Sequence, residues 1–98
     1  MQDTVRELQK AVETLHNCTA QFVEAVDVEE TLRGQNVWQG LVHVFEIQGY
    51  PKATRCYAWS SPIEGSTKRR FFAVLHVPPV ASAQDAVRAA IVQEYRMG

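Results

Sequence analysis

The chain opens with apolar side chains at helical spacing. They recur every three or four residues, at Val5, Leu8, Val12 and Leu15. This spacing places them on one face of an α-helix. Thr4 and Glu7 have the spacing of a capping box, in which the hydroxyl and the carboxylate each bond to a backbone N–H of the first turn. The pattern predicts an N-terminal helix that begins at Thr4 and ends near His16.

Residues 20–47 have a less regular pattern. Even positions are mostly apolar at first, but Glu24 and Glu30 interrupt them. This imperfect period of two and the several valines favour a β-strand, with a helix over residues 19–32 as the open alternative. Turn residues follow at 33–36, and a second apolar stretch covers residues 37–47. We therefore expect a β-hairpin with its turn at Gly34.

Two more strands and a second helix complete the pattern. Residues 54–60 and 69–77 are predicted strands, and the second one stops at two prolines, which cannot donate to a sheet ladder. Ser82 is the predicted N-cap of the final helix, with Asp85 in its first turn. The apolar stripe of this helix consists of Ala83, Ala86, Val87, Ala90, Ile91 and Tyr95.

The predicted element order is α-β-β-β-β-α, which is typical of an α+β domain. Short connections favour an antiparallel meander. We expect two layers: a four-stranded, mostly antiparallel sheet with both terminal helices on one face. With 98 residues and 46% hydrophobic side chains, residues 1–98 form a single domain with one core.

Alternation along the last two strands defines a candidate binding surface. Phe71, Ala73, Leu75 and Val77 form an apolar face of the last strand. On the strand before it, Cys56, Ala58 and Ser60 are small enough to pack closely under helices. The opposite face would then be uncovered, with the side chains of Arg55, Tyr57, Trp59, Arg70, Phe72 and His76. Exposed apolar patches of this kind mark interaction sites.

The hairpin adds further residues to this face, but its register stays open, because a slip of one residue exchanges the two faces of a strand. One register adds Trp38, Val42 and Val44, and the other adds His43 and Phe45.

Three functions fit such a face. The first is self-association as a homodimer, or binding of a protein partner, because aromatic residues and arginine anchor protein interfaces. The second is single-stranded nucleic acid, since aromatic rings stack on bases while basic residues hold phosphates. The third is a peptide or a small ligand. The sequence predicts a non-enzymatic binding domain that acts as a homodimer or binds a protein, with single-stranded nucleic acid as the alternative.

Charge is distributed unevenly along the chain. Residues 1–49 carry three Lys or Arg against eight Asp or Glu, whereas residues 50–98 carry seven against three. The two halves can attract each other within one fold, or each can attract a partner of opposite charge. We expect the acidic run of Glu24, Asp27, Glu29 and Glu30 to be a solvated edge strand, whose charges discourage aggregation.

Enzyme and metal chemistry find little support. The histidines and cysteines lack paired ligand spacing, so no metal, cofactor or catalytic residue is predicted. Cys56 falls on the face expected under the helices, where burial makes a thiol inert. The one arrangement that would support a small enzyme is His43 beside Asp27 across the hairpin, which needs a three-residue turn.

The sequence also indicates where the protein acts. The N-terminal residues lack the basic and then apolar layout of a signal peptide. The longest apolar runs, at 41–45 and 71–77, are too short to span a membrane. With only two cysteines, we expect a cytoplasmic protein with reduced thiols and no membrane contact.

Overall fold

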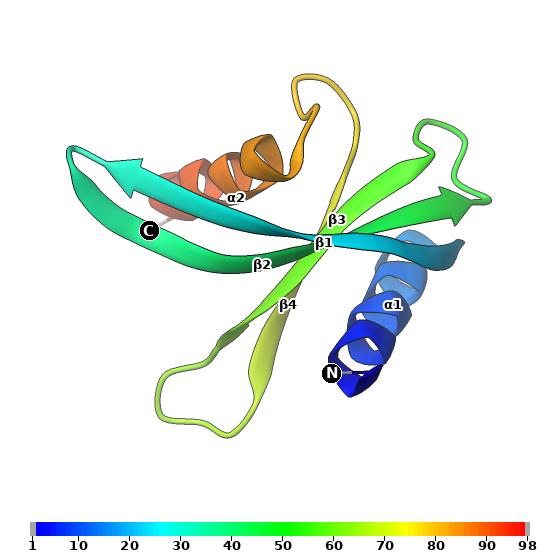
Figure 1. The fold of residues 1–98 in the computed structure, drawn as a ribbon, viewed down its shortest axis with the longest axis horizontal. Coiled ribbons are helices and arrows are strands. Elements are labelled where there is room, and N and C mark those ends of the chain that lie inside the picture. The colour runs from blue at the N-terminus through cyan, green and yellow to red at the C-terminus, as the bar shows by residue number, and fades with distance from the viewer. Residues whose placement is uncertain (1, 98) are drawn as a thin grey trace.

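The computed structural model describes the backbone of residues 2–97 and the side chains of residues 4–93. Its elements are the helix α1 (Gln2–His16), the strands β1 (Thr19–Leu32), β2 (Gln35–Gln48), β3 (Arg55–Pro62) and β4 (Arg69–Leu75), and the helix α2 (Ala83–Met97) (Figure 1). The strands form one antiparallel sheet in the order β1-β2-β3-β4. The predicted α+β class and element order are therefore confirmed.

The first hairpin turns at the predicted place. Arg33 and Gly34 have φ angles of 53° and 81° and join Leu32 to Gln35, which pair with each other. Two successive residues with positive φ form the type of two-residue loop that matches the twist of paired strands. Since residues 19–32 form β1, the alternative of a helix in this region is wrong.

A β-bulge in β1 explains its irregular pattern. Phe22 pairs with Phe45 but Glu24 pairs with Val44, so Val23 is an extra residue. One extra residue shifts the alternation, because successive side chains point to opposite faces of the sheet. Before the bulge, even positions share a face with Phe45. After the bulge, even positions such as Val28 point to the other face.

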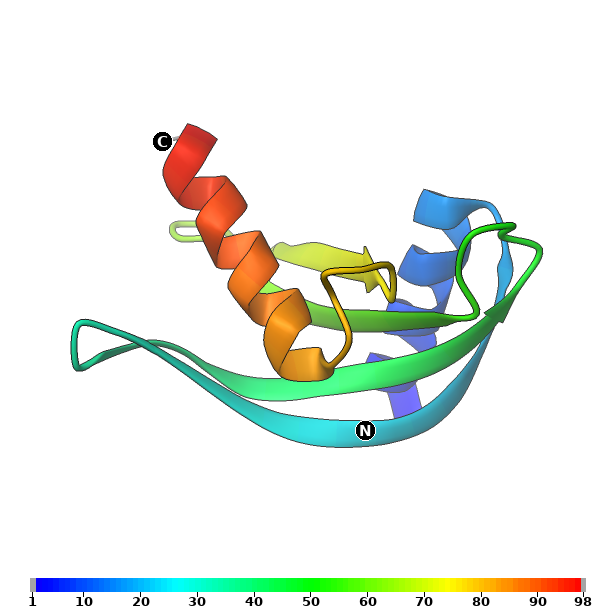
Figure 2. The same cartoon turned by 90° about the horizontal axis from the view of Figure 1, so that it is seen from above.

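The two helices lie on opposite faces of the sheet, which corrects the expectation that both cover one face. Cys56 and Ala58 of β3 pack in the core beneath α1, whereas Tyr57 and Trp59 pack in the core beneath α2. Figures 1 and 2 show one helix on each side of β3 and β4. The physical reason is that β3 is apolar at consecutive positions, so it needs a packing layer on each side.

The helix ends differ in how well the sequence predicts them. Ser82 caps α2 as expected: its Oγ accepts a hydrogen bond from the Asp85 N–H at 3.1 Å. The Asp85 carboxylate accepts one from the Ala81 N–H at 3.1 Å. By contrast, α1 begins at Gln2, so Thr4 lies within the helix and does not cap it. The predicted stripe residue Tyr95 lies outside the described side chains.

The remaining differences are small. The strand β4 ends at Leu75, before the predicted end at residue 77. Neither described helix is long and apolar enough to cross a membrane.

Candidate functional site

The predicted binding face exists as a face but is not uncovered. Trp59 pairs with Phe72 and Tyr57 with Val74, so these four side chains point to the same side of the sheet, as expected. That side is covered by α2. Tyr57 and Trp59 are each only 3% exposed and pack against Ala83 and Val87.

The other predicted site residues lie around this covered centre. Arg55 and Arg70 are exposed, and Phe72 and His76 are half-buried. The expectation of an open aromatic surface is therefore wrong, because a helix assigned to the other face occupies it. Two separate clusters remain, one at each end of the face.

The first cluster joins Tyr57 to His76. The Tyr57 hydroxyl and the His76 Nδ1 share a hydrogen bond of 2.6 Å. Burial raises the pKa of Tyr57, and the neighbouring Arg55 opposes that rise. The residues after β4 are held by a bond of 2.9 Å from the His76 N–H to the Arg55 carbonyl. This cluster fastens the chain leading from β4 to α2.

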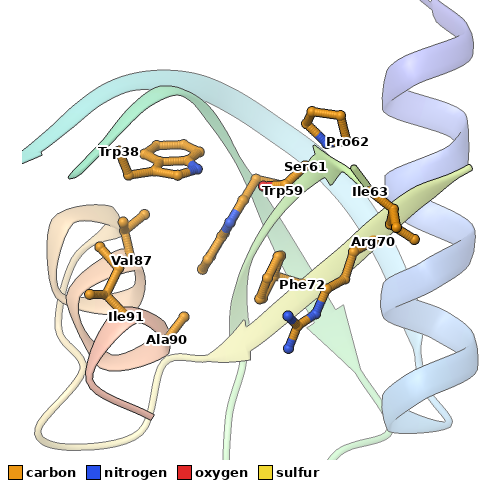
Figure 3. A pocket seen from close by; sticks show the side chains of 10 residues that line it. All are labelled: Trp38, Trp59, Ser61, Pro62, Ile63, Arg70, Phe72, Val87, Ala90 and Ile91. Carbon is orange, nitrogen blue, oxygen red and sulfur yellow. The ribbon is translucent and has the colours of Figure 1, made fainter. Parts of the chain in front are cut away.

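The second cluster forms an aromatic pocket (Figure 3). The rings of Trp59 and Phe72 are stacked, with centroids 5.1 Å apart and planes 8° from parallel. The guanidinium of Arg70 lies over the Phe72 ring, 4.8 Å from its centroid. Trp38 meets Trp59 edge-on at 6.0 Å. The cavity has a volume of about 340 Å³, and Val87, Ala90 and Ile91 of α2 line part of it.

Local sequence explains how Trp38 reaches this pocket. Trp38 lies two residues before Gly40 on β2, so both are on the same face of the strand. A Cβ at Gly40 would stand only 3.0 Å from the Trp38 ring. Because glycine has no Cβ, the indole can lie flat over the strand. The hairpin register therefore adds Trp38, Val42 and Val44 to the α2 face, the first of the two predicted options.

A buried carboxylate holds α2 in position beside the pocket. Glu30 is only 9% exposed. It accepts hydrogen bonds from the Gln84 side-chain amide and from Arg88 Nε, the latter at 3.2 Å. The Gln84 amide also donates to the Glu29 carbonyl at 2.9 Å. Glu30 was predicted to be a solvated edge residue, and this is wrong because the bulge in β1 turns it towards α2.

The pocket offers flat apolar walls and hydrogen-bond donors. Neither indole N–H makes a hydrogen bond to another described residue. Neither N–H is among the buried, unsatisfied atoms of that part of the chain. Arg70 is the only charged side chain among the described residues that line the cavity. The arrangement therefore suits a flat ligand that accepts hydrogen bonds.

The enzyme candidates do not come together. His43 pairs with Ala25 and Asp27 with Leu41, and the turn has two residues where the predicted site needs three. His43 is buried and its Nδ1 has no hydrogen-bond partner in the described structure, while Asp27 is exposed. Burial lowers the pKa of His43.

The cysteine prediction is confirmed in its placement. Cys56 is fully buried under α1, on the opposite face from His76. Burial raises the pKa of its thiol to about 12, so the thiolate is scarce at neutral pH. Within the described residues, no three His, Cys, Asp or Glu side chains are grouped to hold a metal ion.

Comparison of the chain with protein-family models, with curated proteins and with solved structures finds no match.

Proposed function

We propose that the protein is a non-enzymatic binding domain whose ligand occupies the aromatic pocket. The observation that carries this proposal is that Trp38, Trp59 and Phe72 come from three different strands and line one cavity with Arg70. Ligand pockets are concave, mostly apolar and supplied with a few polar groups. The fold positions these side chains before any ligand binds. Gly40 leaves room for the Trp38 ring to lie over the strand, and Glu30 holds α2 through its hydrogen bond with Arg88.

Single-stranded nucleic acid fits this arrangement less well. A strand needs successive rings exposed along a groove. Tyr57 and Trp59 are buried beneath α2, so at most one base could enter the pocket. Self-association or a protein partner stays the competing proposal, because Phe72 and Arg70 still reach the surface at the pocket rim.

The two tryptophans of the chain both line the pocket, so their indole N–H signals in NMR spectra report on it directly. We suggest titrating labelled protein with cinnamyl alcohol, a small neutral probe with one planar ring. Saturable shifts of both indole signals are expected. Sedimentation velocity over a range of concentrations, with and without the probe, shows whether the pocket serves a second copy instead.

Two matched variants locate the site. Ala90 lines the cavity, while Ala89 is exposed on the same helix. Ala90→Leu should narrow the cavity and weaken the shifts, and Ala89→Leu should leave them unchanged. The proposal fails if the indole signals do not move, or if Ala90→Leu binds the probe as the wild type does.

A further inference from the structure

We propose that the ligand of the aromatic pocket is a side chain of an extended peptide, whose main chain pairs with β2 in a gap between β2 and β3. This inference rests on the proposed function and adds the chemical class of the ligand. It follows from the gap in the sheet, from the backbone groups along that gap and from the two cavities beside it.

The sheet is open between β2 and β3. These strands pair only over residues 43–46 and 55–58, although each strand continues beyond this segment. The next hydrogen-bonded pair of the ladder would join Leu41 to Ser60, both of which the structure describes, and it does not form. Figures 1 and 2 show the two strands diverging beyond the paired segment.

The backbone of β2 directs hydrogen-bonding groups into this gap. On the β3 side of β2, the Ile47 N–H donates to the Thr54 carbonyl at 2.9 Å. Every second residue of an antiparallel strand directs its N–H and C=O to the same neighbour, so Leu41 and Gln39 direct theirs towards β3 as well. Since β2 has no pair with β3 before His43, these groups have no partner within the described structure. They are free to bond a further strand.

The facing edge of β3 is already engaged. The Ser60 carbonyl accepts a hydrogen bond from the Arg69 guanidinium at 3.1 Å. Pro62 has no N–H to donate. An incoming strand therefore pairs with β2 rather than with β3.

The two cavities beside the gap lie on opposite faces of the sheet. The aromatic pocket has α2 side chains in its lining, whereas a second cavity of about 350 Å³ is lined in part by Thr4 and Leu8 of α1. Trp38, Ser61 and Pro62 line both cavities, which therefore adjoin at the gap. Successive side chains of an extended strand point to opposite faces. A single strand beside β2 thus reaches both cavities.

Antiparallel pairing, which the whole sheet uses, fixes which peptide side chain meets which cavity. Paired residues of neighbouring strands point to the same face. The peptide residue opposite Gly40 points towards α2, where the Trp38 ring lies close over Gly40. An aromatic side chain suits this position, because rings pack well against rings. Its two neighbours, opposite Leu41 and Gln39, make the main-chain hydrogen bonds and point towards α1.

The cavity on the α1 side suits a neutral polar side chain. Thr4, Ser60 and His43 are in its lining. His43 is only 8% exposed, and its Nδ1 has no hydrogen-bond partner within the described structure. Arg69, the charged residue of this lining, already bonds to Ser60. A hydroxyl group both donates and accepts, so threonine complements an imidazole in either tautomer, and it also favours extended strands.

The test uses the peptide acetyl-Thr-Phe-Thr-amide and two forms of it, each with one N-methyl group. N-methylation of the first threonine removes the N–H that donates to the Leu41 carbonyl, so we expect about tenfold weaker binding. N-methylation of the phenylalanine is the matched control, because its N–H points away from β2, and binding should be unchanged. The shifts of the two indole N–H signals measure all three affinities.

Variants of the protein locate the bound peptide. Ala90→Leu, which narrows the aromatic pocket, should weaken peptide binding, and Ala89→Leu on the exposed side of α2 should not. Valine in place of the first threonine removes its hydroxyl group and should weaken binding to the wild type about fivefold. The same exchange should have no effect on binding to His43→Leu, which has no imidazole for the hydroxyl to meet.

The outcomes separate this inference from the proposed function. If cinnamyl alcohol shifts the indole signals and the peptide does not, the pocket stands as a binding site and the peptide is wrong. Equal binding of the parent peptide and both N-methylated forms would overturn the pairing with β2. If neither compound shifts the indoles, both proposals fall. A dimer in sedimentation velocity that the peptide dissociates would assign the gap to a strand of a second copy instead.

Discussion

The two faces of the sheet are both covered by a helix, but they are filled differently. Beneath α1 the sheet presents small side chains such as Cys56 and Ala58, and Leu8 and Val12 of the helix are at most 1% exposed. Beneath α2 the sheet presents wide rings, and a cavity of about 340 Å³ lies beside Trp59. A cavity of about 350 Å³ lies on the α1 side and is lined by Leu8 and His43 among others. The two faces therefore differ in the side chains that line their cavities, and the candidate binding site is the cavity lined by Trp59, Phe72 and Arg70.

The largest difference is expected when one ring is removed from each face. Phe45 is fully buried on the α1 side, so Phe45→Ala should lower the free energy of unfolding by about 3–5 kcal/mol. Phe72 is half-buried and already borders a cavity, so Phe72→Ala should cost clearly less. Urea denaturation measures both. Equal losses would mean that the two faces are packed alike.

Adding volume should again cost more stability on the α1 face than beside the aromatic pocket, but by a smaller amount. Ala58 is fully buried beneath α1, so Ala58→Leu should destabilise the protein by about 1–3 kcal/mol through overpacking. Ala90 borders the cavity, so Ala90→Leu should change stability by about 0.5 kcal/mol or less. Thermal unfolding of the two variants tests this, and a large loss in Ala90→Leu would contradict the presence of free space beside α2.

The hydrogen-bonded cluster of Tyr57 and His76 on the α2 face allows a finer test. Tyr57→Phe removes the hydrogen bond to His76 Nδ1 and should cost about 1 kcal/mol. Tyr50→Phe is the control, since the Tyr50 hydroxyl makes no hydrogen bond to another described residue. Chemical denaturation of both variants compares the losses. An equal loss of stability in Tyr50→Phe would show that the hydrogen bond from Tyr57 to His76 makes no separate contribution to stability.

The smallest expected effect is a pH dependence on the α1 side. Burial lowers the pKa of His43, so the unfolded chain binds a proton more readily than the folded one. The stability is therefore fully present above the ordinary histidine pKa of about 6.5 and falls as the pH drops below it. His43→Leu should lose less stability than the wild type between about pH 7.5 and about pH 5. Parallel losses in urea denaturation at these two pH values would contradict this.

Regular local patterns were predictable from the sequence. The period of β3 and β4 places Tyr57, Trp59 and Phe72 on one face, and the turn at Gly34 and the cap at Ser82 follow from residue types that favour those conformations. These features depend on neighbours close in sequence. The capping box at Thr4 failed because a helix can begin before a good capping residue.

Irregular and distant features were not predictable. The bulge at Val23 reverses the facing of the rest of β1, so that Val28 and Glu30 face α2 rather than α1. The contact of Glu30 with Arg88 joins residues that are 58 positions apart. Sequence periodicity carries no signal for such a pair.

The sequence by itself determined the elements, their order and the two faces of β3 and β4, because hydrophobic period and turn chemistry act over a few residues. Only the tertiary structure decided which helix covers which face. Both faces of β3 are apolar, so the sequence of this strand does not indicate which helix packs against which face. By covering Tyr57 and Trp59 and leaving space beside Trp38 and Phe72, α2 converts a predicted open surface into a pocket.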